Sequence, residues 1–186
     1  MNVLGQNSPS PWTSRDKFRR GLWQLVESTL FRWSPSRFHS WRCFLLRLFG
    51  ATIPSTESSQ APRIWPDVQV YFPWKLVLNA GAMVGPGVRI YNLDTVSLGE
   101  GANLSRHIHL CAGSHDFGRW SMPLVTAPIT IERNVWIATD CYVGPGVTIG
   151  ELAVVGARSV VVKNLPPSMI CVGNPCVPIK PRPIPQ

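Results

Sequence analysis

Residues 131–166 read IERNVW IATDCY VGPGVT IGELAV VGARSV VVKNLP, a run of consecutive blocks that each begin with Ile or Val. The fifth position of the blocks is mostly small, and the second position is often Gly. A six-residue period fits neither an α-helix, whose apolar residues recur about every 3.6 residues, nor a strand that alternates at every residue. Three blocks can close one triangular coil, whose aliphatic first residues point inward and stack on those of the next coil. We therefore expect a mainly β fold, a parallel β-helix.

The same spacing recurs upstream, in two triplets of aliphatic residues with a small insertion between them. A longer interruption at residues 112–130 indicates an excursion loop between two coils. A single block cannot bury its apolar face, so the coils must stack into one continuous core. The expected inward residues upstream are Ile64, Val70, Leu78, Val84, Ile90, Leu98, Leu104 and Leu110.

The N-terminal segment has a different pattern. Residues 14–49 place apolar residues at helical spacing, with Ser14 as the candidate cap of a helix that begins at Arg15. Pro35 would open a second helical segment and Gly50 would end it. We expect these helices to cover the open end of the β-helix, which otherwise exposes apolar surface. Their Trp and Arg content is also typical of helices that lie on a membrane surface, so peripheral membrane contact is an alternative.

These patterns divide the chain into a helical cap and linker (1–60), a β-helix (61–170) and a Pro-rich tail (171–186). The five cysteines form no C-x-x-C pair and the N-terminus has no apolar signal core, so we expect reduced thiols and a cytoplasmic protein. The inner face of the membrane is a second expected location, by way of the helices. The net charge of +8 is not gathered into a long basic run, which argues against a nucleic-acid partner.

The excursion contains the strongest candidate for a catalytic group. Acyl transfer to a hydroxyl needs a general base with a pKa near neutrality, and His suits that role best. His115 lies where the repeat breaks, beside Asp116. His107 and His109 are close in sequence, so three histidines could instead bind zinc, as in the γ-class carbonic anhydrases. The ligand spacing of those enzymes does not match, and we expect no metal.

Three segments resemble the hexapeptide-repeat O-acetyltransferases, in the branch of the maltose and galactoside enzymes and closest to the colanic-acid-biosynthesis type. They are LCAGSHDF (110–117), APITIERNVWIATDCYVGPGVTIG (127–150) and VVGARSVVVKNLPPSMICVGNPCVPIK (154–180). The resemblance implies a left-handed β-helix and a homotrimer with active sites in grooves between subunits. It also implies transfer of an acetyl group from acetyl-CoA to a saccharide hydroxyl in polysaccharide biosynthesis, with His115 as the base.

The resemblance implies further site residues. Gly87 stands where the maltose and galactoside enzymes have an acceptor-contacting Asn, so the acceptor is expected to differ from theirs. An N-acetyltransferase acting on an amino-sugar and a non-catalytic scaffold are two further interpretations of the same repeat. The expected acceptor contacts are Asn92, Asp94, Asp116 and Phe117. The expected acetyl-CoA contacts are Trp136, Ala138, Ala157, Lys163 and Lys180.

Overall fold

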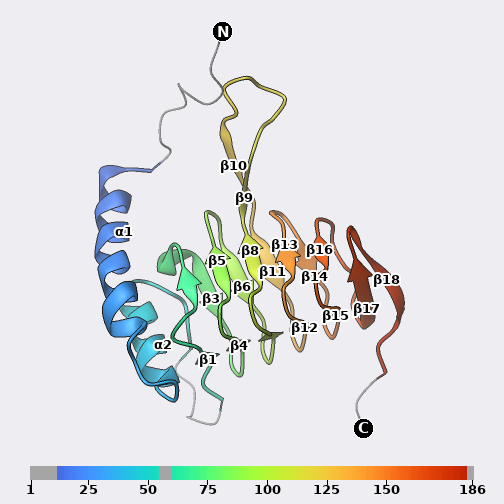
Figure 1. Cartoon of the computed structure of the whole chain (residues 1–186), viewed down its shortest axis with the longest axis horizontal. Helices are drawn as coiled ribbons and strands as arrows, with labels where there is room; N and C mark the ends of the chain where they lie inside the picture. The colour runs from blue at the N-terminus through green and yellow to red at the C-terminus, as the bar shows by residue number, and fades with distance from the viewer. Residues whose placement is uncertain (1–11, 55–59, 184–186) are drawn as a thin grey trace.

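The computed structural model describes residues 12–54 and 60–183, which form a parallel β-helix with helices at its N-terminal end (Figure 1). Successive coils pass through three sheets, which are the faces of a triangular prism. The chain runs from face A to face B to face C and then into face A of the next coil. A short 3-10 turn, Pro73–Lys75, leads into the first strand of face A.

Each face collects one strand from each coil. Face A contains β3 (Leu76–Leu78), β6 (Val96–Leu98), β11 (Ile129–Ile131) and β14 (Thr148–Ile149). Face B contains β1 (Arg63–Ile64), β4 (Met83–Val84), β7 (Asn103–Leu104), β12 (Trp136–Ile137), β15 (Val154–Val155) and β17 (Met169–Gly173). Face C contains β2 (Gln69–Val70), β5 (Arg89–Tyr91), β8 (His109–Cys111), β13 (Tyr142–Val143) and β16 (Val160–Val161).

The six-residue pattern sets the register between coils, which confirms the predicted fold. On face B, Val84, Leu104 and Ile137 are aligned in neighbouring strands, and the other faces align their first-position residues in the same way. Every first-position residue that the sequence predicts to point inward is at most 2% exposed. Burying each of these side chains contributes about 1.5–3 kcal/mol before the opposing chain entropy.

The corners between faces A and B are closed by residues with positive φ, stacked from coil to coil: Gly81, Gly101, Asn134, Leu152 and Ser168. The amide of each residue after the first donates to a carbonyl of the preceding coil. At position 101 the φ of +64° favours glycine, and an added Cβ would lie 2.3 Å from Oδ1 of Asn134, so that side chain would have to move. The corners are therefore hydrogen-bonded ladders as regular as the faces.

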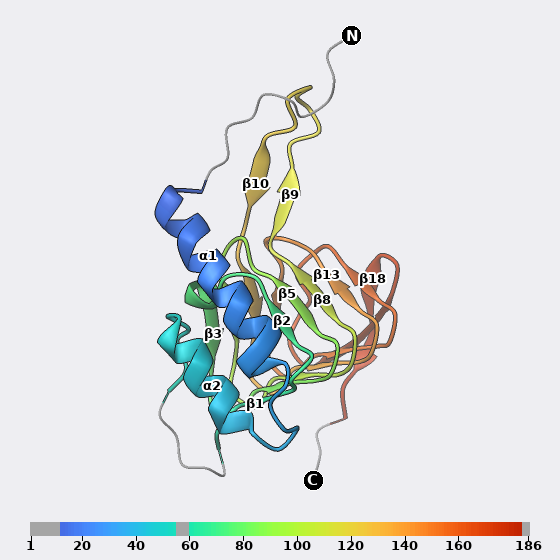
Figure 2. The same cartoon turned by 60° about the vertical axis from the view of Figure 1, so that its left-hand side comes forward.

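Two helices cover the N-terminal end of the prism (Figure 2). The helix α1 (Ser14–Val26) continues through a π-helical turn (Glu27–Phe31), and α2 (His39–Leu48) follows. Trp23, Phe31 and Leu46 are fully buried in the same core as the first coils. The indole Nε1 of Trp23 donates to the carbonyl of Val70 at 2.7 Å, which ties α1 to β2.

The helix boundaries differ from those expected. Thr13, not Ser14, is the N-cap of α1: its Oγ1 accepts a hydrogen bond from the amide of Asp16, whose carboxylate accepts one from the amide of Thr13. This reciprocal pairing uses two amides that the first helical turn leaves free. The helix α2 begins at His39 rather than at Pro35.

Arg42, in α2, is fully buried, and its guanidinium pairs with no carboxylate within residues 12–54 and 60–183. Its Nε donates to the carbonyl of Ile64 at 2.6 Å. Its Nη atoms donate to Oγ of Ser34 and to the carbonyls of Pro35 and Ser36 at 2.5–2.9 Å. Arg42 thus joins the turn before α2 to the first strand of the β-helix. Burial lowers the pKa of Arg42 from its usual value.

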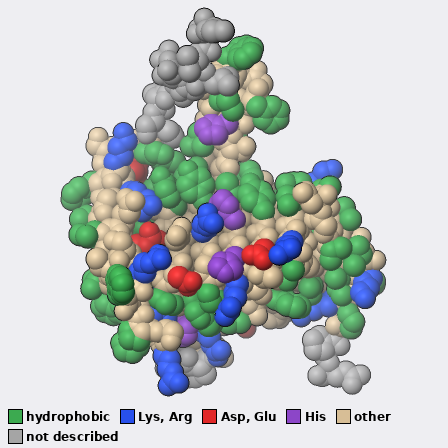
Figure 3. Space-filling model, in the orientation of Figure 1, with side chains coloured by type: hydrophobic (Ala, Val, Ile, Leu, Met, Phe, Trp, Pro, Cys, Tyr) green, Lys and Arg blue, Asp and Glu red, His purple; other side chains and the backbone are tan. Residues whose placement is uncertain are grey.

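The outward side of the helices is apolar. Leu30, Trp33, Phe38 and Trp41 are 38–83% exposed and line a hollow of about 640 Å³. Figure 3 shows hydrophobic side chains along this helical edge, at the left of the view. Within residues 12–54 and 60–183, no helix combines the length and the apolar character that a membrane span requires.

The C-terminal part is more ordered than a simple extended tail. The strand β17 runs past the expected boundary at residue 171 and pairs antiparallel with β18 (Cys176–Pro181). Beyond β18, Nη1 of Arg182 donates to the carbonyls of Asn134 and Leu152 at 3.0 and 2.9 Å. These bonds hold the end of the chain against the corner between faces A and B.

Candidate functional site

A two-stranded hairpin leaves the coils at the corner between faces C and A (Figure 1). It consists of β9 (Gly113–His115) and β10 (Leu124–Thr126), paired antiparallel with His115 opposite Leu124. At its base Gly113 packs on Leu93, where a Cβ would lie 2.6 Å from Cδ1. The hydroxyl of Thr126 donates to Oδ2 of Asp94 at 3.2 Å. The predicted excursion is therefore an ordered arm fixed at its base.

The ring of His115 is exposed and oriented by the backbone of its own hairpin. Its Nδ1 lies 2.7 Å from the carbonyl oxygen of Met122, a residue with a φ of +42°. A carbonyl only accepts hydrogen bonds, so Nδ1 donates in this contact, and in the neutral ring the lone pair is then on Nε2. The hairpin thus holds one exposed imidazole by a single ring nitrogen. Sequence analysis did not identify Met122, because the contact uses a carbonyl that every residue has.

Asp116 does not orient His115. Its Oδ1 accepts a hydrogen bond from the amide of Gly118 at 3.0 Å, and Oδ2 lies 3.2 Å from Nε of Arg119. Phe117 is 91% exposed beside it, at the tip of the hairpin. Asp116 therefore shapes the turn, while Phe117 presents a free aromatic face.

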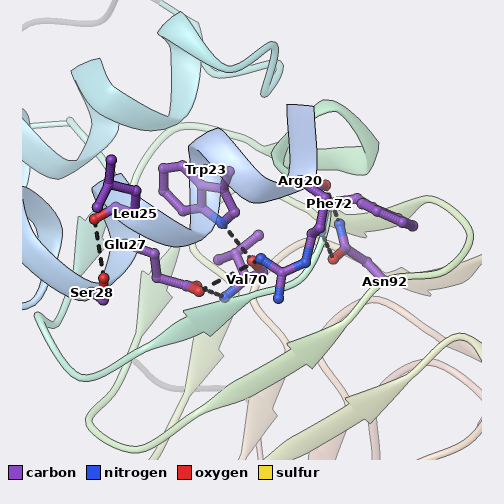
Figure 4. Close-up of polar contacts among 8 residues, drawn as sticks. All are labelled: Arg20, Trp23, Leu25, Glu27, Ser28, Val70, Phe72 and Asn92. Atoms are coloured by element: carbon purple, nitrogen blue, oxygen red, sulfur yellow. Dashed lines mark hydrogen bonds and ion pairs between the residues drawn. The ribbon is translucent and has the colours of Figure 1, made fainter. Parts of the chain in front are cut away.

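Asn92 lies elsewhere than expected (Figure 4). It is fully buried, its Oδ1 accepts from the amide of Phe72 at 2.9 Å, and its Nδ2 donates to the carbonyl of the same residue at 2.6 Å. We correct the expected acceptor contact: both functions of this amide are used to join two coils. Asp94 is half-buried at the base of the hairpin, where Oδ1 also accepts from the amide of Thr95 at 2.7 Å.

Trp136 lies on face B, which is opposite the corner that carries the hairpin. Its indole Nε1 donates to Oγ of Ser105 at 3.0 Å, and its side chain is 45% exposed. Ala138 and Ala157 follow β12 and β15 at the corner between faces B and C. The body of the prism separates these three residues from His115, so one chain does not bring them together.

Lys163 follows β16 at the corner between faces C and A, the same edge of the prism from which the hairpin projects. Lys180 lies in β18, at the end of face B. Both side chains are exposed and form no ion pair within residues 12–54 and 60–183. The expected donor contacts are therefore divided between the hairpin edge and face B.

Face B has room for a narrow ligand. Beside Trp136 lies a cavity of about 370 Å³, lined by Ser105, Arg106 and Thr139 among others. Ala138 and Ala157, which follow β12 and β15, have small side chains at the adjoining corner. An exposed Lys has the charge and reach to contact a phosphate.

The three neighbouring histidines occupy separate positions. His107, with a φ of +56°, forms the corner between faces B and C over Gly87, and His109 points outward from face C against Tyr142. Among the residues that the structure describes, no group of three His, Cys, Asp or Glu side chains could hold a metal ion. The single-chain cluster behind the zinc interpretation is therefore not formed.

Comparisons with known proteins agree with this architecture. Residues 128–163 match the family model described as "Bacterial transferase hexapeptide (six repeats)". The chain is 42% identical over 182 residues to the "Putative colanic acid biosynthesis acetyltransferase WcaF" of Escherichia coli, covering 98% of this chain and 97% of that protein. It is 32% identical over 117 residues to the galactoside O-acetyltransferase of Escherichia coli, covering 60% and 58%.

Solved structures show the same fold. A hexapeptide-repeat acetyltransferase of Vibrio cholerae in complex with acetyl coenzyme A matches with a TM-score of 0.78 at 21% identity, over 98% of this chain and 97% of that one. A galactoside acetyltransferase in complex with coenzyme A matches with a TM-score of 0.76 at 23% identity, over 92% and 84%. The chain belongs to the hexapeptide-repeat acetyltransferases.

Proposed function

We propose that this protein transfers an acetyl group from acetyl-CoA to a hydroxyl of a saccharide, in the biosynthesis of a polysaccharide, with His115 as the general base. The contact between Nδ1 of His115 and the carbonyl of Met122 carries the proposal, because it leaves Nε2 free to accept a proton. The relatives support the class of reaction, since they are named as acetyltransferases, including one for galactosides and one for colanic acid.

Acetyl-CoA supplies the acetyl group as an activated thioester. Nε2 of His115 accepts the proton of the acceptor hydroxyl while that oxygen attacks the thioester carbon. The carbon–sulfur bond then breaks, and the resulting imidazolium returns the proton to the departing sulfur. One ester forms, one thioester is lost, and His115 regains its starting state. The carbonyl of Met122 holds the ring in place through both proton transfers.

The proposed donor site consists of Trp136, Ala138, Ala157, Lys163 and Lys180. We expect wild-type protein to bind acetyl-CoA in calorimetry, and a Lys163→Ala variant to bind about 5- to 30-fold more weakly. A charge-assisted hydrogen bond to a phosphate is worth about 1–2 kcal/mol at an exposed position. A Lys17→Ala variant, which removes an exposed charge from α1, should bind as wild type. Failure of the wild type to bind acetyl-CoA would contradict the proposed function.

The acceptor side of the proposed site is the hairpin. Phe117 offers an aromatic face for a sugar ring, and Asp94 and Asp116 lie at the base and the tip of the arm. A base of this kind would also serve an amine acceptor, as in an N-acetyltransferase of amino-sugars. Treating the product with hydroxylamine separates the two, because an ester is cleaved and an amide is not.

We propose that the working site forms between chains of a homotrimer. His115 lies on the edge between faces C and A, whereas Trp136 and Ala157 lie across the prism on face B and its far corner. When copies pack side by side, the hairpin edge of one chain can face the donor residues of its neighbour. This arrangement supplies a complete site without any bending of the hairpin.

We also propose a cytoplasmic protein that binds the anionic inner surface of a membrane through its helices. The five thiols are free, as is usual in a reducing compartment. The exposed apolar residues Leu30, Trp33, Phe38 and Trp41 lie within residues 12–50, a segment that contains eight Arg and Lys but only two acidic residues. Amphipathic helices with Trp on the apolar side and basic flanks favour anionic lipid surfaces.

Vesicle flotation tests this membrane contact. We expect the full chain to float with phosphatidylglycerol vesicles, and a Trp33→Ser/Phe38→Ser variant to bind at least about tenfold more weakly, because a buried aromatic side chain contributes about 1.5–3 kcal/mol. Phe117→Ser removes an equally exposed aromatic residue from the hairpin and should bind as wild type. Equal binding by all three proteins would rule out the helical surface as the contact.

A further inference from the structure

A cavity of about 400 Å³ lies on face C beside the root of the hairpin, a volume suited to a small ligand. Its floor consists of outward-pointing residues of β2, β5 and β8, and α1 forms one wall. The strand register arranges the floor in two rows. The first row is Gln69, Arg89 and His109. The second row, nearer the hairpin, is Tyr71, Tyr91 and Cys111.

The wall of the cavity carries an ion pair (Figure 4). Nη1 of Arg20 is 4.0 Å from Oε2 of Glu27, and the guanidinium lies over the ring of Tyr71 at 4.2 Å. Oε1 of Glu27 accepts a hydrogen bond from the amide of Val70 at 2.7 Å, so the carboxylate is committed to the protein. Nη1 of Arg20 donates no hydrogen bond to any residue that the structure describes. The pair leaves the wall nearly neutral.

Arg89 on the floor has no such partner. Its side chain makes no hydrogen bond and no ion pair within residues 12–54 and 60–183. Because the charges of Arg20 and Glu27 cancel, the guanidinium of Arg89 leaves the cavity with one net positive charge. Burial and the charge of Arg89 both lower the pKa of His109, which favours the neutral imidazole, with one donor and one acceptor. The floor is therefore suited to a ligand with a negative charge and hydroxyl groups.

We propose that this cavity binds a carboxylate-bearing sugar unit of the acceptor, with the guanidinium of Arg89 facing the carboxylate. The planar guanidinium matches a carboxylate with two parallel hydrogen bonds, and Tyr71 and Tyr91 give the sugar ring an apolar surface with polar hydroxyls. This inference rests on the proposed acetyltransferase function and adds the class of acceptor, an acidic oligosaccharide.

The position of the cavity relative to the base fits an acceptor of more than one sugar. Cys111 in the cavity precedes His115 by four residues of extended chain, roughly 13 Å at about 3.3 Å per residue. This distance exceeds the length of one sugar ring. The acidic unit in the cavity and the hydroxyl at His115 therefore belong to different units of the same chain.

Cys111 provides a readout that does not depend on acetyl transfer. It is the cysteine that lines the cavity, and the other four are buried. Burial raises the pKa of Cys43 and Cys176 to about 11 and raises those of Cys141 and Cys171 as well, so their reactive thiolates are scarce. Iodoacetamide at pH 8 should therefore alkylate Cys111 first in the folded, full-length protein, which peptide mass spectrometry verifies.

The test measures how sugars slow this alkylation. At about four times its dissociation constant, methyl glucuronide should slow labelling of wild type about fivefold, because the free fraction falls as 1/(1 + [L]/Kd). Methyl glucoside at the same concentration should not. Arg89→Gln should lose the protection by glucuronide, whereas Arg63→Gln, which removes an exposed Arg from face B, should keep it.

The inference would be overturned by equal protection by both glycosides, by no protection at all, or by protection unchanged in Arg89→Gln. Protection by glucose 1-phosphate but not by methyl glucuronide would show that the cavity binds a phosphate and not a carboxylate, and would also overturn the inference. Acetyl-CoA binding is measured in the same wild-type and Arg89→Gln preparations. In wild type, normal donor binding with failed protection rejects the acidic acceptor alone, whereas lost donor binding rejects the acetyltransferase proposal itself. Normal donor binding by Arg89→Gln shows that the variant is folded.

Discussion

A His115→Ala variant will transfer acetyl groups about 10²–10⁴-fold more slowly than wild type, the usual effect of removing a general base. The ring is exposed and its one hydrogen bond is to a backbone carbonyl, so the substitution should leave the fold intact. We expect kcat to fall while the affinity for acetyl-CoA stays the same, since Trp136 and Lys163 are unchanged. Initial rates of acetyl ester formation, followed by chromatography, measure the effect.

Asp116→Asn is the matched control for His115→Ala. The carboxylate contacts Arg119 and the amide of Gly118, not the imidazole, and an exposed ion pair is worth about 1 kcal/mol or less. Because Asp116 lies on the acceptor side of the proposed site, its substitution should change the KM for the acceptor, while kcat at saturating acceptor should remain within about fivefold of wild type. If His115→Ala kept full activity, or if Asp116→Asn lost as much as His115→Ala, the assignment of the base or of its support would be wrong.

Mixing His115→Ala with Trp136→Ala, which removes a proposed donor contact, extends this prediction to the assembly. If His115 of one chain serves the donor site of its neighbour, oligomers formed from equal amounts of His115→Ala and Trp136→Ala chains regain intact sites. Half of the hairpins and half of the donor faces are wild type, so roughly a quarter of the sites are complete. A mixture no more active than the sum of its parts would place the whole site within one chain.

Replacing Arg42 by Met will destabilise the protein by about 3–5 kcal/mol. The side chain volume is largely kept, but the buried carbonyl of Ile64 and the part-buried carbonyls of Pro35 and Ser36 lose their donors. Each buried polar group left without a partner costs about 1–3 kcal/mol. For a chain of this size, each kcal/mol lowers Tm by about 2–4 °C, so calorimetry should show a loss of at least about 6 °C.

Arg37→Met is the control for Arg42→Met, because Arg37 is an exposed Arg in the same turn. Exposed substitutions usually change stability by about 0.5 kcal/mol or less. Similar Tm values for both variants would show that the buried guanidinium contributes no more than a surface residue.

Much of the fold is predictable because one contact is repeated many times. The spacing from Ile131 to Val161 predicts an inward residue at every sixth position, and all of these positions are buried. The inward residues of every coil must stack on those of the next coil. A wrong assignment of one block would therefore place its apolar residue out of line with the residues above and below it. The helices are not repeated, which is why the cap lies at Thr13 instead of Ser14 and the second helix begins after Pro35.

The site is less predictable for a different reason. His115 can be singled out because it lies where the repeat breaks, but its support by Met122 and the role of Asp116 depend on the shape of one turn. The sequence position of Asn92 suggests an acceptor contact, although its amide pairs with the backbone of the preceding coil. Nothing in the sequence singles out Arg89, because the cavity that it lines is closed on one side by α1, which is distant from it in sequence.

The hairpin lies between strands β8 and β11, which join the regular coils on either side of it. Its length can therefore change without shifting any stacked residue, because the insertion begins and ends at one corner. Natural selection can change the length of the arm or its side chains while the surface around Trp136 is preserved. A lineage with this architecture is free to diversify the sugars it modifies and still keep a single activated donor.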